Sequence, residues 1–201
     1  MSALHGFGLG IASENATGDT LDVFYPQPLS HVSGALCDRL TGVTGRLDSA
    51  QLRELATMLH EVGESTLGDI ASRLIETDKP IVAAVLSDNR AAGSVEEAYL
   101  KLHLLSHRLV KPHQTDLTGL FGLLPNVAWT DQGPIDLAEL PQRQLDARLR
   151  GTILEVSSVD KFPKMTNYVV PAGVRIAHTA RVRLGAYLGE GTTVMHEGFI
   201  N

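Results

Sequence analysis

The fold class of this chain is decided by Val170-Pro-Ala-Gly-Val-Arg-Ile-Ala-His-Thr-Ala-Arg-Val-Arg-Leu-Gly-Ala-Tyr-Leu-Gly-Glu-Gly-Thr-Thr-Val-Met-His-Glu-Gly-Phe-Ile-Asn201. Every sixth residue in this stretch is a branched aliphatic. A strand repeats its apolar residues at a period of about two and a helix at about 3.6. A period of six is typical of hexapeptide repeats, in which three units form one triangular coil of a left-handed parallel β-helix. The aliphatics are Val170, Ile176, Val182, Leu188, Val194 and Ile200.

The repeat divides the chain into two parts. We predict an α/β N-terminal domain over residues 1–165 and the start of a left-handed parallel β-helix over residues 166–201. The repeat fills fewer than two coils of about 18 residues, whereas a solenoid needs about three or more stacked units and a polar cap. We therefore expect an N-terminal fragment of a longer protein that is inactive alone, with Val182, Leu188 and Val194 uncovered.

The N-terminal part alternates short apolar runs with amphipathic stretches, which is typical of an α/β domain. Ser94, with Glu97 three residues later, marks the start of the clearest helix, which ends before Pro112. Asp48 or Ser49 is expected to cap an earlier helix. The predicted strands or extended segments cover residues 3–12, 20–25, 81–86, 123–129 and 152–159, and the predicted helices cover residues 52–62, 66–77, 95–109 and 135–150.

Composition restricts the class of protein. The 201 residues are 43% hydrophobic, and no apolar run approaches the roughly 20 residues of a membrane span. The N-terminus lacks the basic and apolar segments of an export signal. The single cysteine, Cys37, fits a reducing cytoplasm and is expected to be a small core or surface residue. A net charge of −6 disfavours a nucleic-acid partner, so an anionic substrate would need a local basic patch.

Several catalytic motifs are missing from the sequence. The absence of GxSxG, GxxxxGK[ST], CxxC and HExxH argues against serine hydrolases, nucleotide triphosphatases, thiol redox proteins and zincins. The segment Gly6-Phe-Gly8-Leu-Gly10 lacks the spacing of a dinucleotide-binding loop. His103 and His107 lie four residues apart on a predicted helix and could share a metal, but no carboxylate accompanies them. We predict that both histidines pack or lie on the surface.

Two histidines occupy equivalent places in the repeat. His178 and His196 stand at the third position of units that are three apart, so they should stack at about the 4.8 Å strand spacing. Hydratases of the carbonic anhydrase type bind zinc with histidines on such a face, and a neighbouring subunit could supply a third ligand. A metal-dependent hydratase is therefore an alternative function.

Glu197 lies in Met195-His-Glu-Gly198, beside a histidine and just before a glycine. A carboxylate in this position can act as general base toward an amine or as nucleophile toward a thioester. His196 and Arg183 are candidate substrate-binding residues, and Arg183 is the first choice because it is the outward arginine nearest the motif. Arg175 and Arg181 add positive charge near the same edge. The alternative is a solvated corner with ordinary surface arginines.

Five long segments of the chain carry the pattern of a known protein family. They are Ala98-Tyr-Leu-Lys-Leu-His-Leu-Leu-Ser-His-Arg-Leu-Val-Lys-Pro-His113, Leu124-Pro-Asn-Val-Ala-Trp129, Ser158-Val-Asp-Lys-Phe-Pro-Lys-Met165, Tyr168-Val-Val-Pro-Ala-Gly-Val-Arg-Ile176 and Arg181-Val-Arg-Leu-Gly-Ala-Tyr-Leu-Gly-Glu-Gly-Thr-Thr-Val-Met-His-Glu-Gly-Phe-Ile-Asn201. These segments closely resemble the tetrahydrodipicolinate N-succinyltransferases of the bacterial type that carries a large N-terminal domain. The resemblance is strongest from about residue 95 onward.

The resemblance implies a cytoplasmic homotrimer of the diaminopimelate route to lysine, with no membrane partner. Such an enzyme moves a succinyl group from succinyl-CoA to the amino group of a cyclic dicarboxylate, and its catalytic glutamate falls on Glu197. Much of the family's CoA-binding surface lies beyond Asn201, and His178 stands where relatives often have an aspartate. The resemblance also implies a divalent cation, magnesium, with unidentified ligands. Another acyl donor, the metal hydratase and an inactive scaffold fragment remain alternatives.

Overall fold

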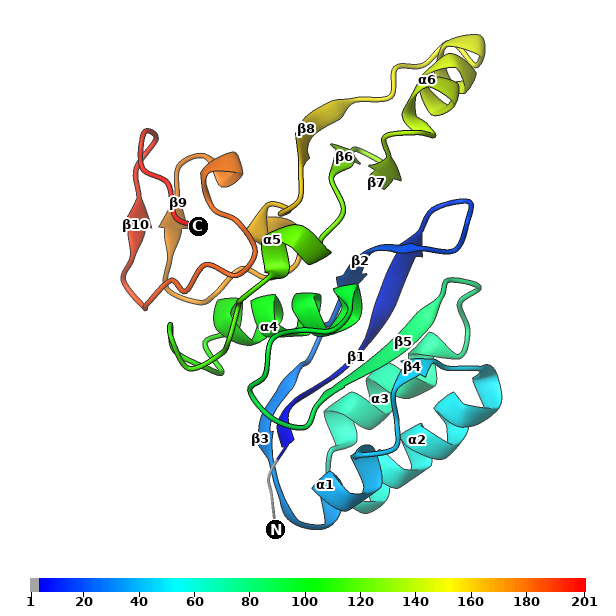
Figure 1. Ribbon diagram of the computed structural model, residues 1–201, viewed down its shortest axis with the longest axis vertical. Helices are drawn as coiled ribbons and strands as arrows, with labels where there is room; N and C mark the ends of the chain where they lie inside the picture. Colours follow the sequence, from blue (N-terminus) through cyan, green and yellow to red (C-terminus); the bar gives the residue numbers. More distant parts are fainter. Residues whose placement is uncertain (1–3) are drawn as a thin grey trace.

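The first part of the molecule is an antiparallel sheet with helices on both faces (Figure 1). The computed structural model describes residues 4–201. The strands follow the order β2-β1-β5-β4, and β3 pairs with the start of β1. The sheet is formed by β1 (Leu4–Glu14), β2 (Thr20–Phe24), β3 (Leu29–Val32), β4 (Gly45–Arg46) and β5 (Ile81–Leu86).

Strand β1 is buried on both faces because each face carries a different layer. Side chains alternate between the two faces of a strand. Phe7 and Leu9 point into a core that they share with the helices α1 (Gly34–Leu40), α2 (Ser49–Glu61) and α3 (Ser65–Leu74). Glycines occupy the alternate positions and face the helix on the opposite side.

The glycines of β1 allow helix α4 (Val95–Ser106) to pack directly on the strand backbone. A Cβ atom added at Gly8 would lie 2.7 Å from the Tyr25 ring and 2.9 Å from Cδ1 of Leu100, both fully buried. One added at Gly6 would lie 2.8 Å from Cδ1 of Leu104. The glycine-rich segment therefore serves helix packing.

Helix α2 begins at a complete capping box, and its cap, Asp48, is one of the two residues that the sequence predicts. The Asp48 carboxylate accepts hydrogen bonds from the backbone N–H groups of Ala50 and Gln51, both at 2.8 Å. The Gln51 side chain accepts in return from the N–H of Asp48 at 2.9 Å. These bonds satisfy backbone donors that a helix N-terminus otherwise leaves unpaired.

Among the described residues, no helix has both the length and the apolar character needed to cross a membrane.

Helix α4 is the central element of the structure. The Ser94 hydroxyl accepts a hydrogen bond from the N–H of Glu97 at 3.2 Å, which confirms the predicted cap. All residues from 98 to 106 are buried, including Lys101 and His103. The helix contacts the sheet on one side, and on the other it shares a core with residues from 182 to 194. This double coverage explains why polar side chains on α4 are buried.

A smaller antiparallel sheet leads from the first part to the repeat. Its strand order is β7-β6-β8. Figure 1 shows that the helix following β7 extends away from the body of the molecule. The elements are α5 (Leu120–Leu123), β6 (Val127–Thr130), β7 (Gly133–Asp136), α6 (Leu140–Leu149) and β8 (Val156–Asp160).

The predicted helix over residues 135–150 is wrong in its first part. Ile135 lies in β7 and pairs with Ala128 of β6. The chain then turns, because the Asp136 carboxylate accepts a hydrogen bond from the N–H of Ala138 at 2.9 Å. Helix α6 begins only at Leu140, with Pro141 in its first turn, where proline is favoured. Apolar spacing alone could not reveal that a neighbouring strand pairs with this segment.

Other predictions for the N-terminal part hold with small shifts. The strands at 3–12, 20–25 and 81–86 correspond to β1, β2 and β5, although residue 3 lies outside the described residues. The predicted helices at 52–62, 66–77 and 95–109 correspond to α2, α3 and α4. Five short elements of this part were not predicted: α1, α5, β3, β4 and β7. Each has at most seven residues, too few for a clear periodic pattern.

Candidate active site

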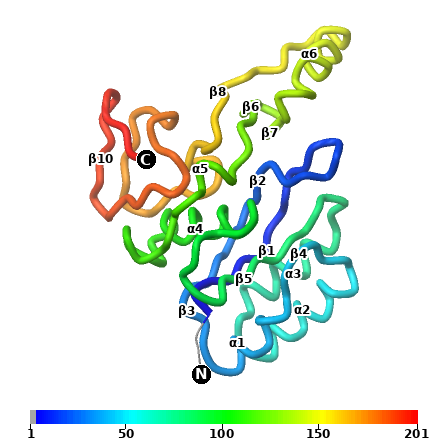
Figure 2. Tube along the Cα trace, viewed as in Figure 1, coloured from blue at the N-terminus to red at the C-terminus, as the bar shows by residue number. Residues whose placement is uncertain are grey.

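The repeat segment, residues 170–201, forms turns joined by parallel pairs. Strand β9 (Arg175–Ile176) pairs in parallel with β10 (Thr193–Val194). Val182 also forms a parallel bridge with Ile200. The partners in each pair are eighteen residues apart, which is three hexapeptide units. The two strands lie side by side in Figure 1, and Figure 2 shows that α4 lies between this segment and the first sheet.

The sixfold aliphatics differ in burial. Val182, Leu188 and Val194 are buried and share a core with α4, so the expectation that they lack cover is wrong. The repeat predicts which side chains point inward, but it carries no information that a helix far earlier in the chain covers them. Val170 is 65% exposed, so its predicted inward position is also wrong. It precedes the first paired strand, β9.

The end of α4 holds the repeat segment in place through backbone groups. The Ser106 hydroxyl donates to the carbonyl of Ala186 at 3.1 Å and accepts from the N–H of Gly185 at 2.9 Å. Arg108 donates from Nε to the carbonyl of Leu188 and from Nη2 to that of Ala172, at 2.5 and 2.9 Å. These bonds connect the N-terminal part to two different turns of the repeat segment.

The candidate catalytic residue, Glu197, lies on a tight turn. The N–H of Gly198 donates to the carbonyl of Met195 at 2.9 Å, which places His196 and Glu197 at the two central positions. The side chains of His196 and Glu197 are 70% and 81% exposed. The turn directly follows β10, so the parallel pairing fixes where it lies.

Two side chains contact the Glu197 carboxylate, one on each oxygen. Nδ1 of His196 lies 2.7 Å from Oε1 of Glu197. Nη2 of Arg181, on the preceding turn of the repeat segment, lies 3.7 Å from Oε2. The structure therefore brings together the predicted pair, His196 and Glu197, with a basic residue sixteen positions earlier in the chain.

His178 lies next to His196, as the repeat predicts. The two ring centroids are 5.7 Å apart, and the rings meet edge to face. The neighbouring backbone is paired in parallel, since the N–H of Ala177 donates to the carbonyl of Val194 at 3.0 Å. The His178 ring thus contacts the His196 ring on the exposed face of the repeat segment.

Arg183, the predicted substrate-binding arginine, is engaged by the strand that precedes the repeat segment. Its Nη2 lies 2.6 Å from a carboxylate oxygen of Asp160 in β8. The guanidinium also lies over the ring of Phe162, 6.0 Å from the centroid. The side chain of Arg183 stays 41% exposed. Asp160 and Phe162 therefore hold this guanidinium in one orientation at the surface.

His103 and His107 have a structural role, as predicted. His103 is fully buried; its Nδ1 donates to the carbonyl of Tyr99 at 2.8 Å, and its Nε2 accepts from the N–H of Tyr25 at 3.2 Å. Desolvation by burial lowers the pKa of His103 to about 3, so the ring is neutral. The ring of His107 stacks on the ring of His103, with the ring centroids 5.9 Å apart.

Cys37 is buried in the core that α2 and α3 share with the sheet, in agreement with the predicted core or surface position.

The structure does not identify the divalent cation that the resemblance implies. Within residues 4–201, no group of three or more histidine, cysteine, aspartate or glutamate side chains could hold a metal ion. A structural or catalytic zinc site uses at least three such protein ligands. Within one chain, His178 and His196 therefore supply two of the three protein ligands of a catalytic zinc site, and the third would have to come from a neighbouring subunit.

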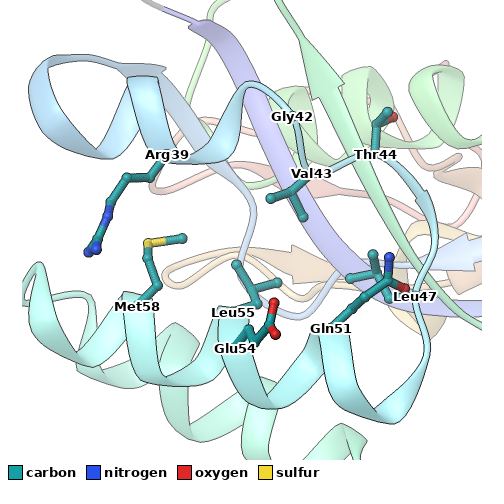
Figure 3. A pocket seen from close by; sticks show the side chains of 9 residues that line it. All are labelled: Arg39, Gly42, Val43, Thr44, Leu47, Gln51, Glu54, Leu55 and Met58. Atoms are coloured by element: carbon teal, nitrogen blue, oxygen red, sulfur yellow. The ribbon is translucent and has the colours of Figure 1, made fainter.

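Two hollows lie on the surface, and the lining of the larger one includes Ile200 and Asn201. One, of about 290 Å³, lies between α2 and the segment after α1, with Val43, Leu55 and Met58 among its lining residues (Figure 3). The other, of about 670 Å³, is lined in part by Thr115 and Tyr187. Glu197 lines neither hollow. The carboxylate is presented on an open surface.

Sequence reasoning missed which arginine contacts Glu197. Arg181 and Arg183 flank the buried Val182, so both point outward. The parallel bridge between Val182 and Ile200 shows that the Glu197 turn lies beside this segment. Counting eighteen residues back from the turn could have drawn attention to residues 178–181, but the Asp160 contact of Arg183 could not be anticipated.

Comparison with known proteins gives one consistent result. The family model described as tetrahydrodipicolinate N-succinyltransferase middle matches residues 124–164. The chain is 55% identical to the 2,3,4,5-tetrahydropyridine-2,6-dicarboxylate N-succinyltransferase of Pseudomonas putida, over 100% of this chain and 60% of that protein. It is 48% identical to the protein of that name from Vibrio cholerae, over 99% of this chain and 60% of the relative.

A solved structure has the same fold. The crystal structure of a Campylobacter jejuni protein, provisionally named 2,3,4,5-tetrahydropyridine-2-carboxylate N-succinyltransferase, superposes with a TM-score of 0.82 at 24% identity. The superposition covers 98% of this chain and 57% of that one. The comparisons confirm the resemblance found in the sequence: the chain is homologous to these proteins and spans about 60% of the length of the curated relatives that it matches.

Proposed function

We propose that the protein is a tetrahydrodipicolinate N-succinyltransferase, which transfers the succinyl group of succinyl-CoA to its cyclic dicarboxylate acceptor in lysine biosynthesis by the diaminopimelate route, in the cytoplasm. The observation that carries this proposal is 41–55% identity across the chain to relatives that all bear this enzyme's name. The same relatives favour the transferase over the hydratase alternative. The geometry around Glu197 fits the transfer chemistry.

We also propose that residues 166–201 are the first coils of a left-handed parallel β-helix and that residues 1–165 are the N-terminal domain. The parallel pairs with eighteen-residue spacing support the first statement. The single core that α4 shares with the repeat segment indicates that the two parts are firmly attached. In such an arrangement α4 packs against the aliphatic stack and shields it from water.

In the proposed reaction, the acceptor nitrogen forms a bond to the succinyl carbonyl carbon and the carbon–sulfur bond to CoA breaks. In a one-step route, Glu197 takes the proton from the attacking nitrogen as general base. In a two-step route, Glu197 first attacks as nucleophile and the carbon–sulfur bond breaks; the bond between the succinyl carbon and Glu197 then breaks as the nitrogen attacks and loses its proton. The departing thiolate takes up a proton. His196 contacts one Glu197 oxygen at 2.7 Å and so helps to orient the carboxylate.

We assign Arg183 to binding a substrate carboxylate. Nη2 of Arg183 donates a hydrogen bond to the Asp160 carboxylate, and the other N–H groups of the guanidinium can donate to a ligand. A guanidinium that is held before the ligand arrives loses less conformational freedom on binding. Because the whole chain carries a net charge of −6, such local cations are needed to attract two anionic substrates.

The proposed function is tested by following CoA release. The purified full-length protein is mixed with succinyl-CoA and tetrahydrodipicolinate, and free thiol is measured with a disulfide reagent. We expect thiol release that depends on the acceptor and yields a succinylated product by mass spectrometry. Acetyl-CoA is the control donor and distinguishes a succinyltransferase from other acyltransferases. A lack of acceptor-dependent release from any acyl-CoA would contradict the proposal.

The open position of Glu197 supports assembly into a closed trimer. A side chain that is 81% exposed is surrounded by water, whereas acyl transfer to an amine competes with hydrolysis unless water is excluded. A neighbouring copy placed against this face would provide the cover. We therefore expect a stable cyclic trimer of the full-length protein in light scattering. A stable monomer with full activity would contradict this expectation.

A further inference from the structure

We propose that Arg181 is the residue that positions the Glu197 carboxylate for succinyl transfer. This inference rests on the proposed function and adds a residue that the family resemblance did not assign. Nη2 of Arg181 lies 3.7 Å from Oε2 of Glu197, while His196 contacts Oε1 at 2.7 Å. One carboxylate oxygen thus has a hydrogen-bond partner, and the other has an ion-pair partner from a different turn.

Two contacts restrict the orientation of the Glu197 carboxylate more than one contact does. A glutamate side chain has three rotatable bonds, and on an exposed turn one contact leaves rotation about the remaining bonds free. His196 bonds to one oxygen and the charge of Arg181 lies near the other, so the rotamer of Glu197 that turns Oε2 toward Arg181 is favoured over the others. A base or nucleophile must approach the reacting atom with defined geometry, and misplacement by about 1 Å can cost roughly 100-fold in rate.

The backbone keeps Arg181 beside the Glu197 turn. The carbonyl of Arg181 accepts a hydrogen bond from the N–H of Ile200 at 2.9 Å, and the next residue, Val182, forms the parallel bridge to Ile200. Ile200 lies only three residues after Glu197. The N–H of Arg181 also donates to the carbonyl of His178 at 3.1 Å. The two turns are therefore joined at the backbone, and the side-chain contact follows from that connection.

Arg181 and Arg183 have separate tasks although both point outward. Arg183 is directed to Asp160 and Phe162, and Arg181 to Glu197. Loss of Arg183 should therefore weaken substrate binding, and loss of Arg181 should slow the chemical step. An ion pair between side chains that are 43% and 81% exposed contributes little to stability, so we expect loss of Arg181 to slow turnover without lowering the melting temperature.

The test compares Arg181→Met, Arg181→Lys and Arg183→Met in the full-length protein by steady-state succinyl transfer. For Arg181→Met we expect kcat to fall roughly 10- to 100-fold, with each KM within about twofold of the native value. Arg181→Lys should regain part of that loss, because the ammonium keeps the charge but lacks the planar fork of donors. Arg183→Met should instead raise one KM roughly tenfold or more.

Each outcome of this comparison decides the proposal. Arg181→Met should melt within about 2 °C of the native protein and keep the native oligomeric state. A kcat within about twofold of native for Arg181→Met, in a preparation whose native protein turns over normally, would overturn the inference and leave the proposed function intact. Equal losses in the methionine and lysine variants together with lowered melting would assign Arg181 to folding and also overturn it. Absence of transfer by the native protein would refute the proposed function itself.

Discussion

Replacing Glu197 by alanine should lower kcat for succinyl transfer by about 10³-fold, because the variant loses the only group proposed to accept the proton or carry the acyl group. The melting temperature should stay the same, since the side chain is 81% exposed and its two contacts lie at the surface. Thiol release with saturating substrates measures the first quantity, and circular dichroism on heating measures the second.

The matched control for Glu197 is Glu190, an exposed glutamate on another turn of the repeat segment. Glu190→Ala removes the same charge from the same part of the molecule and should leave kcat within about twofold of native. Glu197→Gln keeps the size and one acceptor oxygen, and it should be almost as slow as Glu197→Ala, because an amide is neither a base nor a competent nucleophile. Nearly native turnover in either Glu197 variant would show that another residue performs the chemistry.

The second large effect is expected in the fold. Gly8→Ala should lower the free energy of unfolding by about 2–3 kcal/mol, the usual cost of forcing an extra group into a packed core. The added Cβ would lie 2.7 Å from the Tyr25 ring and 2.9 Å from Leu100, and both side chains are fully buried, so neither can move aside freely. Strand propensity alone predicts the opposite sign, because glycine weakens the interior of a strand.

Gly42→Ala is the control for this substitution. A Cβ atom at Gly42 would meet no other atom within 4 Å, and its backbone is outside the left-handed region. We expect a change within about 0.5 kcal/mol for Gly42→Ala and a melting temperature on the order of 5–10 °C lower for Gly8→Ala. Chemical denaturation measures the free energy of unfolding of both variants. Equal values for Gly8→Ala and Gly42→Ala would contradict the prediction and show that α4 can shift away from β1.

Several features of the fold followed from short stretches of sequence. Asp48 and Ser94 cap the helices that the sequence assigns to them, because capping depends on residues within one helical turn. Helix α6 shows the limit of such reasoning. Its apolar spacing extended the predicted helix back to Ile135, but Ile135 pairs with Ala128, and Pro141 was the better local mark of the helix start.

The sequence by itself determined the hexapeptide period and the candidate catalytic glutamate, since a period is a local property and the motif around Glu197 is contiguous. Only the tertiary structure decided which arginine faces that glutamate, why the glycines of β1 are required and why Val182, Leu188 and Val194 are buried. Each of these depends on a partner distant in the chain: Asp160 for Arg183, the neighbouring turn for Arg181, and α4 for both β1 and the repeat segment. A repeat specifies the direction of its own side chains, whereas the surface that covers them is set by long-range packing.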